Sequence, residues 1–420
     1  MAPQQAVTVL AEVRPGQVGA LTSDLEATDK DDNRRELLPF EDLPVHFARF
    51  VVIDESIDPE GGTTPAQLIF LSDIDGPLRT YLSHLVDAAG EGLDKIYRHC
   101  VGYPAVPTVR DRRQYLKRHI VRAAAAYINT VGRSVEQVRH DAEVRHAIED
   151  FLDDHDWAGQ SPAAVRAAVQ EFVGSKPSLR ASLRPAPRPS LWWRVKEGAH
   201  LVATVAVLVA LLPILLVVAP LWLVAVRIHE IRDVPDTPPP DPAHVDHLAR
   251  AEGHLVQNQF SAIGFVKPGW LRRTTVSTVL WAVNLSSRHV FNHGNLAGIR
   301  TIHFARWIFL DGKRRVMFAS NYDGSLESYM DDFIDKVAWG LNAAFSNGRG
   351  YPRTRWLVFG GARDEPAFKN FLRNHQIPTQ IWYSAYGDLT AVNAAGNAAI
   401  RDGLHGSMTD QQLDEWVARL

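Results

Sequence analysis

A block of 35 residues occurs twice in this chain, and this repeat constrains the fold more than any other feature. Residues 70–104 read FLSDIDGPLRTYLSHLVDAAGEGLDKIYRHCVGYP, and residues 318–352 read FASNYDGSLESYMDDFIDKVAWGLNAAFSNGRGYP. The blocks align without a gap and share twelve identical positions, among them Asp75/Asp323 and the closing Gly-Tyr-Pro. A similar phrase precedes each block: HFARFVVID starts at His46, and HFARWIFLD starts at His303. The sequence therefore predicts two copies of one module.

Each copy shows a pattern of alternating strands and helices. In the second copy we expect strands at 259–266, 301–310, 314–321, 355–360 and 379–386, with helices at 270–290, 324–345, 364–374 and at the end. Asp311-Gly312 between two of these strands is a hairpin signal. The core order is β-α-β-β-α-β, the ferredoxin-like pattern. The first copy repeats this order, with residues 57–66 inserted in its hairpin and no counterpart of the 355–360 strand.

Helices cover only one face of a ferredoxin-like sheet, so the other face must be buried elsewhere. Pairing the copies sheet to sheet buries both faces. We therefore predict an α+β fold in which two tandem ferredoxin-like modules form a single-chain dimeric α+β barrel with a central membrane segment. The expected divisions are a first module at 1–155, a helical and Pro/Arg-rich linker at 156–200, the membrane segment at 201–226, a Pro-rich linker at 227–250 and a second module at 251–420.

Residues 201–226 are apolar without interruption, with no charged residue and only Thr204 polar. About 20 apolar residues suffice to cross a bilayer, and a buried soluble helix of this length normally has a polar face. Basic residues flank both ends, which predicts that both flanks lie on the cytoplasmic side. Pro213 and Pro220 can interrupt a helix. We therefore expect a membrane protein with both modules on the cytoplasmic side, and favour a shallow hairpin over a single span.

Composition excludes several classes of protein. A formal net charge of −3 gives no reason to expect binding to nucleic acid. Cys100 is the only cysteine, which excludes an intramolecular disulfide and a cysteine-based zinc site. We assign no metal ligand, and find no P-loop, dinucleotide fingerprint or nucleophile elbow. The sequence alone names no reaction.

Three polar residues of the second copy are the candidate catalytic residues: His303, Arg306 and Asp323. A histidine beside apolar side chains can act as a base or bind heme iron, and an arginine can hold a carboxylate or peroxide. The first copy keeps the same three residue types, so symmetric structural roles are the alternative. Those roles are a backbone hydrogen bond for the histidine, an ion pair with Asp54/Asp311 or Asp75/Asp323 for the arginine, and a cap of the next helix for the aspartate.

Strand periodicity adds an expectation about side-chain direction. Successive strand residues alternate between faces, which places His303 and Trp307 on one face and Arg306 on the other. Gly92 and Gly340 lie inside helical stretches, where glycine costs roughly 1 kcal/mol relative to alanine. We expect both to mark close packing.

The copies differ most in their aromatic residues. The first copy has no tryptophan before Trp157, whereas seven tryptophans follow residue 269. Aromatic walls with a few polar groups are typical of an apolar ligand pocket, and equally of a filled core. The candidate ligand-binding residues, all in the second copy, are His293, Trp307, Asn321, Trp382 and Tyr383.

The element order and the repeat resemble the dimeric α+β barrel superfamily, which includes dye-decolorizing peroxidases. The HFAR…DG…GYP phrases also resemble a bacterial membrane-associated family with duplicated modules. In the peroxidases a distal acid lies in Gly-x-x-Asp-Gly; here Ser320-Asn321-Tyr322-Asp323-Gly324 lacks the first glycine. The resemblance implies heme as a cofactor. Two hypotheses follow: a membrane-associated oxidoreductase acting on an apolar or lipid-derived small molecule, or a non-catalytic membrane-associated binding or scaffold protein.

Overall fold

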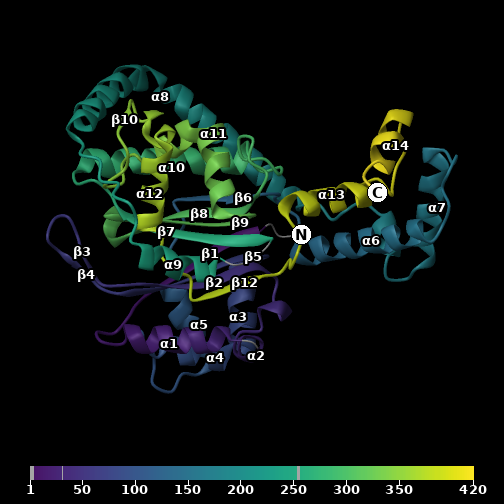
Figure 1. Cartoon of the computed structure of the whole chain (residues 1–420), viewed down its shortest axis with the longest axis horizontal. Helices are drawn as coiled ribbons and strands as arrows, with labels where there is room; N and C mark the ends of the chain where they lie inside the picture. Colours follow the sequence, from purple (N-terminus) through teal and green to yellow (C-terminus); the bar gives the residue numbers. More distant parts are fainter. Residues whose placement is uncertain (1–3, 31, 253–255) are drawn as a thin grey trace.

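The computed structural model describes residues 4–30, 32–252 and 256–420, and two antiparallel sheets form its centre (Figure 1). Each sheet has four strands, in the orders β1-β5-β2-β12 and β6-β8-β9-β7. The strands of the first sheet are β1 (Gln4–Glu12), β5 (Gln67–Asp75), β2 (Val45–Ile53) and β12 (Ile381–Ser384). Those of the second sheet are β6 (Ala125–Ile128), β8 (Ile302–Leu310), β9 (Arg315–Asp323) and β7 (Gln257–Phe265). The expected mixed fold with antiparallel sheets is confirmed.

The fourth strand of each sheet comes from the other copy. β12 belongs to the second copy but pairs with β2, and β6 belongs to the first copy but pairs with β8. The residues just before β6 and just before β12 contact the first strand of their own copy, which is β1 or β7. The Leu10 amide donates to the His119 carbonyl at 2.9 Å, and the Ile377 amide donates to the Ser261 carbonyl at 2.8 Å. The two sheets are thereby joined along both edges. The sequence pattern did not predict this exchange of β6 and β12.

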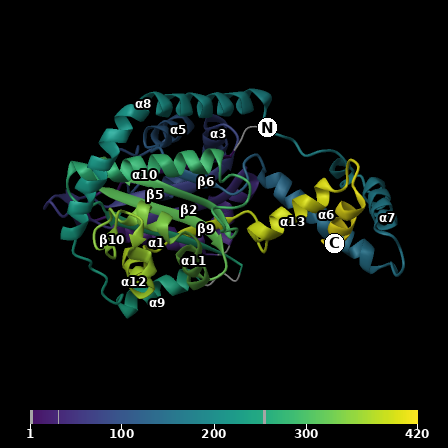
Figure 2. The same ribbon diagram turned by 90° about the horizontal axis from the view of Figure 1, so that it is seen from above.

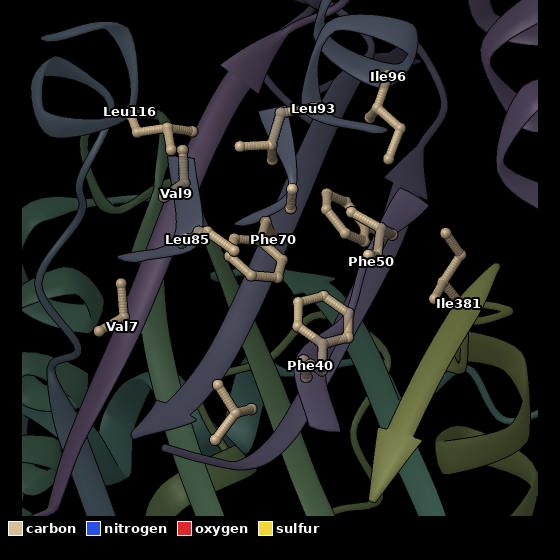
Figure 3. Close-up of a cluster of buried hydrophobic side chains, with 14 of the residues drawn as sticks. Val7, Val9, Phe40, Phe50, Phe70, Leu85, Leu93, Ile96, Leu116 and Ile381 are labelled. Carbon is tan, nitrogen blue, oxygen red and sulfur yellow. The ribbon is translucent and has the colours of Figure 1, made fainter. Parts of the chain in front are cut away.

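The outer face of each sheet is covered by helices. The helices of the first copy are α1 (Val18–Asp29), α2 (Asp32–Leu37), α3 (Leu78–Ala88), α4 (Gly90–Tyr97) and α5 (Val109–Arg118). Figure 3 shows strand residues such as Phe50 and Phe70 packed against helix residues such as Leu85, Leu93 and Leu116. The second sheet is covered by α10 (Trp270–His289), α11 (Leu326–Phe345) and α12 (Glu365–His375).

The inner faces of the sheets pack against each other through a smaller apolar cluster. Val51, Ile69 and Leu71 of the first sheet meet Ile308 and Met317 of the second. All five are essentially removed from solvent. This contact buries the sheet faces that the helices leave uncovered.

One long helix, α8 (Leu191–Arg232), connects the copies. It is long and apolar enough to cross a membrane, and none of its most apolar window is buried. Pro213 and Pro220 lie inside this continuous helix, so the predicted hairpin break is wrong. Figure 1 shows that α8 is bowed rather than straight, as prolines inside a helix commonly cause.

The remaining elements lie outside the two four-stranded sheets. α6 (Val135–Asp153) packs on α13 (Ala391–Asp402), and α7 (Pro162–Ser175) packs on α14 (Asp410–Val417), to one side of the sheets (Figure 2). The predicted 355–360 strand is instead a small hairpin, β10 (Thr354–Arg355) and β11 (Phe359–Gly360), outside the main sheets. Short elements complete the chain: β3 (Ser56–Ile57), β4 (Thr63–Thr64), α9 (Pro242–Ala251) and single turns at Phe40–Asp42, Arg180–Leu183, Asp311–Lys313 and Gly361–Arg363.

Candidate functional site: paired polar groups and an apolar cavity

In each copy, the histidine that opens the HFAR phrase is buried and bonded to an aspartate. His46 Nε2 lies 2.9 Å from Asp75 Oδ1, and His303 Nε2 lies 2.6 Å from Asp323 Oδ1. A carboxylate only accepts hydrogen bonds, so Nε2 carries the proton in each pair. The candidate catalytic residues His303 and Asp323 are therefore in direct contact, but in an arrangement that the first copy shares.

A β-bulge sets the direction of both histidines. The β2–β5 register shifts between Val45 and Phe47, and the β8–β9 register shifts between Ile302 and Phe304. A bulge inserts one extra residue and re-aims its side chain. His303 consequently packs against Phe47, with ring centroids 5.2 Å apart, at the inner side of the sheets. The expectation that it shares a face with Trp307 is wrong.

The two aspartates hold helices far away in the sequence. Asp75 Oδ2 accepts from the Val135 amide, and Asp323 Oδ2 accepts from the Ala391 amide, each at 2.8 Å. Val135 and Ala391 are the first residues of α6 and α13. An anionic group at a helix N-terminus satisfies free N–H groups and the helix dipole. The aspartates thus cap helices as predicted, but not the helices that directly follow them.

The arginines of the two HFAR phrases, Arg49 and Arg306, cross between the sheets. Arg49 donates to the Phe260 carbonyl at 2.9 Å and to the Ser320 carbonyl at 2.7 Å. Arg306 donates to the Val7 carbonyl at 2.6 Å and forms an ion pair with Asp73. The predicted partners Asp54/Asp311 and Asp75/Asp323 are therefore wrong. Both guanidiniums are buried, and they tie one sheet to the other reciprocally.

These two arginines differ in the charge that faces them. Arg306 meets the carboxylate of Asp73, whereas Arg49 meets the amide oxygen of Asn321 at the equivalent position. Burial lowers the pKa of Arg49 to about 9, a shift that nearby Arg306 increases and Asp73 opposes. Burial also raises the pKa of Asp73, against the effect of both arginines. The carboxylate of Asp73 is therefore the counter-charge for two buried guanidiniums, those of Arg49 and Arg306.

Little space remains beside these polar groups. The space next to His46, His303 and Tyr386 is about 30 Å³, and the space between Arg49 and Arg306 is about 10 Å³. A cavity needs roughly 10–15 Å³ of such space to hold one water. Tyr386, whose hydroxyl is bonded to His46 Nδ1, further closes the first space. Neither space can hold a tetrapyrrole, so the residues present do not fit the heme that the peroxidase resemblance implies.

An apolar cavity lies elsewhere, between α10, α11 and the outer face of the second sheet. Its volume is about 300 Å³, within the range of small-molecule sites. Among the described residues that line it, none is charged and none is a histidine. The walls come from the sheet (Phe260, Trp307, Phe318), from α10 (Val279, Ala282, Val283, Ser286, Ser287), from α11 (Leu326, Tyr329, Met330, Phe333, Val337, Trp339, Gly340, Leu341, Ala343, Ala344, Phe345) and from Phe291, Leu296, Ala297, Phe368 and Leu372.

The wall of this cavity is open at Gly340. A Cβ added to that glycine meets nothing closer than the Val337 side chain at 4.0 Å. The expectation that Gly340 marks close packing is therefore wrong. Trp339 beside it is 58 % exposed, and Ala282 across the cavity is exposed, so the mouth lies between α10 and α11.

The predicted ligand-binding residues separate in the structure. Trp307 lines the cavity, but His293 is exposed and is not part of its wall. Trp382 and Tyr383 belong to the first sheet, because β12 pairs with β2. Trp382 Nε1 lies 3.1 Å from Asn321 Oδ1 between the sheets. The signal that sequence reasoning missed is the run of small residues on α10 and α11, Ala282, Gly340, Ala343 and Ala344, which creates the space.

Comparison of the chain with protein-family models, with curated proteins and with solved structures finds no match.

Proposed function

We propose that this protein is a membrane-associated binding protein that holds an apolar, lipid-derived molecule in the cavity between α10 and α11. The observation that carries the proposal is the 300 Å³ cavity with uncharged walls in the second copy. Apolar cavities stay dry, and one of about half this volume is sufficient to bind benzene. The candidate base and cation, His303 and Arg306, are instead committed to Asp323 and Asp73. This favours binding over oxidoreductase chemistry.

The proposed scaffold is the single-chain dimeric α+β barrel. It is supported by the strand order, by the bonds that join the sheets along both edges, and by the shared inner cluster. In such a barrel the reciprocal contacts of Arg49 and Arg306 act as structural links between the modules.

We also propose that both modules lie on the same, cytoplasmic, side of the membrane. Glu197 near the start of α8 accepts from Arg288 of α10 at 2.6 Å, and Trp222 near its end donates to Thr275 of α10 at 2.9 Å. At 1.5 Å per residue, the α8 segment from Glu197 to Trp222 measures about 38 Å along its axis. The α10 segment from Thr275 to Arg288, which contacts both of its ends, measures only about 20 Å. If α8 crossed a hydrocarbon core about 30 Å thick as a straight helix, its two ends would lie farther apart than the contacts with α10 hold them. The bow of α8 is instead suited to lying in one leaflet.

Same-side attachment can be tested with single cysteines. Burial raises the pKa of the Cys100 thiol to about 12, so the native protein should give little background labelling. Leu191→Cys, Leu216→Cys and Val234→Cys each replace an exposed residue, at the start, middle and end of the segment. With protein bound to the outside of vesicles, we expect a membrane-impermeant maleimide to label positions 191 and 234 but not 216. Protection of only one end would show a span.

Ligand binding can be tested by filling the cavity. Gly340→Leu projects a side chain into the open wall, whereas Gly340→Ala adds only the Cβ and is the matched control. With a fluorescent polyene fatty acid ester as probe, we expect leucine to weaken binding about tenfold or more and alanine to leave it nearly unchanged. Equal binding by all three proteins, or no binding by the wild type, would refute the proposed function.

A further inference from the structure

We infer that the β10–β11 hairpin of the second copy binds the headgroups of anionic phospholipids and inserts aromatic side chains at the surface of the bilayer. This inference rests on the membrane association proposed above, and it adds a lipid class and a second membrane contact besides α8. Its basis is the composition of the hairpin, the way α8 holds it, and the uncharged helix face that lies beside it.

The hairpin distinguishes the second copy from the first. Both repeats close with Gly-Tyr-Pro. In the first copy, residues 105–108 contain no strand, and α5 begins directly after them. In the second copy, β10 and β11 lie between the Gly-Tyr-Pro phrase and α12. A segment that the shared fold does not require points to a role of its own.

The hairpin presents aromatic and basic side chains together. Trp356 is 45 % exposed, and Phe359 is 58 % exposed. Arg353 and Arg355 beside them are exposed and form no ion pair with a described residue. Tryptophan is enriched at membrane–water interfaces, and anionic lipids attract arginines that lie close to the surface. The hairpin is therefore complementary to a bilayer surface that contains anionic phospholipid.

A buried glutamate of α8 fixes the shape of this hairpin. Glu230 is 1 % exposed and accepts hydrogen bonds from the Trp356 and Leu357 amides, each at 2.8 Å. It also accepts from the Thr354 hydroxyl at 2.9 Å. Trp356 and Leu357 have φ values of 57° and 64°. Residues other than glycine keep such left-handed conformations only where the surroundings impose them. The carboxylate thus holds the turn that keeps Trp356 on the outside of the protein.

The hairpin lies beside the apolar helix that is proposed to enter the bilayer. Figure 1 shows β10 below α8, and Leu357 belongs to one apolar cluster with Val226 of α8 and Leu271 of α10. The most apolar part of α8 is not buried by the protein. If α8 lies in one leaflet, a hairpin attached near its end lies at the level of the headgroups.

The outward face of α10 continues this surface as far as the cavity. Its exposed residues are uncharged: Trp270, Thr274, Thr278, Trp281 and Ala282. The outward face of a helix in contact with water normally carries charged residues. At about 100° per residue, Trp270 and Trp281 lie only about 20° apart around the helix axis, so they form one stripe. This stripe fits the same lipid surface and ends beside Ala282, at the mouth of the cavity.

Single cysteines carrying an environment-sensitive fluorophore test the inference in full-length protein reconstituted in vesicles. Phe359→Cys reports on the hairpin and Leu216→Cys on α8; Val106→Cys, exposed in the segment of the first copy that lacks the hairpin, is the matched control. In phosphatidylcholine vesicles containing phosphatidylglycerol, we expect a nitroxide-labelled lipid to quench the label at 359 and at 216 but not at 106. In vesicles of phosphatidylcholine alone, quenching at 359 should be much weaker.

A pair of charge variants tests the lipid class. Arg353→Gln/Arg355→Gln should lower the equilibrium constant for the lipid-bound hairpin, measured from the quenched fraction at 359, about fivefold for each arginine removed. Arg113→Gln/Lys117→Gln removes the same charge from exposed positions of α5 and should leave quenching at 359 unchanged.

Three results would contradict the inference in different ways. Quenching at 216 without quenching at 359 would overturn it and leave the proposed membrane association intact. Equal quenching at 359 in vesicles with and without phosphatidylglycerol would overturn the assignment of an anionic lipid. Absence of quenching at both positions would refute the membrane association itself.

Discussion

Equivalent helices of the two copies enclose very different spaces. In the first copy, a Cβ added at Gly92 would lie 2.2 Å from the Leu37 carbonyl oxygen, because α2 packs directly on α4. In the second copy, the equivalent Gly340 faces open space. Ile96 of the first copy is fully buried, and its counterpart is the smaller Ala344. The same glycine thus permits close contact in one copy and a cavity in the other.

This contrast separates residues that maintain the scaffold from residues that serve a ligand. The histidines, arginines and aspartates shared by the copies make equivalent bonds in both, which is the behaviour of structural groups. Positions where the copies diverge, such as Ala344 in place of Ile96 and Trp307 in place of Phe50, line the cavity. Divergence between repeated copies is therefore the better guide to the site.

The largest expected effect concerns the one carboxylate between the two buried arginines. Asp73→Asn would remove the ion-pair partner of Arg306 and the main favourable charge near Arg49. Removing one partner of a buried ion pair typically costs about 3–5 kcal/mol. We expect urea denaturation to show a loss of this size in the free energy of unfolding.

The equivalent change in the other copy sharpens this result. Asn321→Asp would place a second carboxylate beside Arg49 and balance the charges of the cluster. We expect a much smaller change in stability than for Asp73→Asn. Equal losses from both variants would contradict the assignment of Asp73 as the shared counter-charge.

Gly92→Ala and Gly340→Ala test the packing difference directly. Alanine at 92 must displace the Leu37 backbone, which should cost about 1–3 kcal/mol as overpacking does. Alanine at 340 meets no close neighbour and should stabilise α11 by up to about 1 kcal/mol, the difference in helix propensity. Thermal unfolding of the two variants would measure this. If both variants changed stability in the same direction, the packing around Gly92 and Gly340 would not differ as described.

The sequence predicted the local elements well and the long-range pairing poorly. Expected strands such as 301–310 and helices such as 270–290 lie within one or two residues of β8 and α10, because local patterns determine them. The exchange of β6 and β12 depends on contacts between segments more than a hundred residues apart, which no local pattern contains. The β-bulges at His46 and His303 also made the predicted direction of the histidine side chain wrong. One inserted residue reverses the direction that period-two alternation predicts.

The smallest expected effect distinguishes the two histidines. His46 bonds both Asp75 and the Tyr386 hydroxyl, whereas His303 bonds Asp323 and only stacks on Tyr386, with centroids 5.8 Å apart. Because His46→Ala also leaves a buried hydroxyl unpaired, it should cost about 1–2 kcal/mol more than His303→Ala. Urea denaturation of both variants would measure the difference. Tyr386→Phe, which removes only the hydroxyl, should eliminate most of it in a double-mutant cycle, and a cycle without coupling would show that the two copies hold their histidines equally.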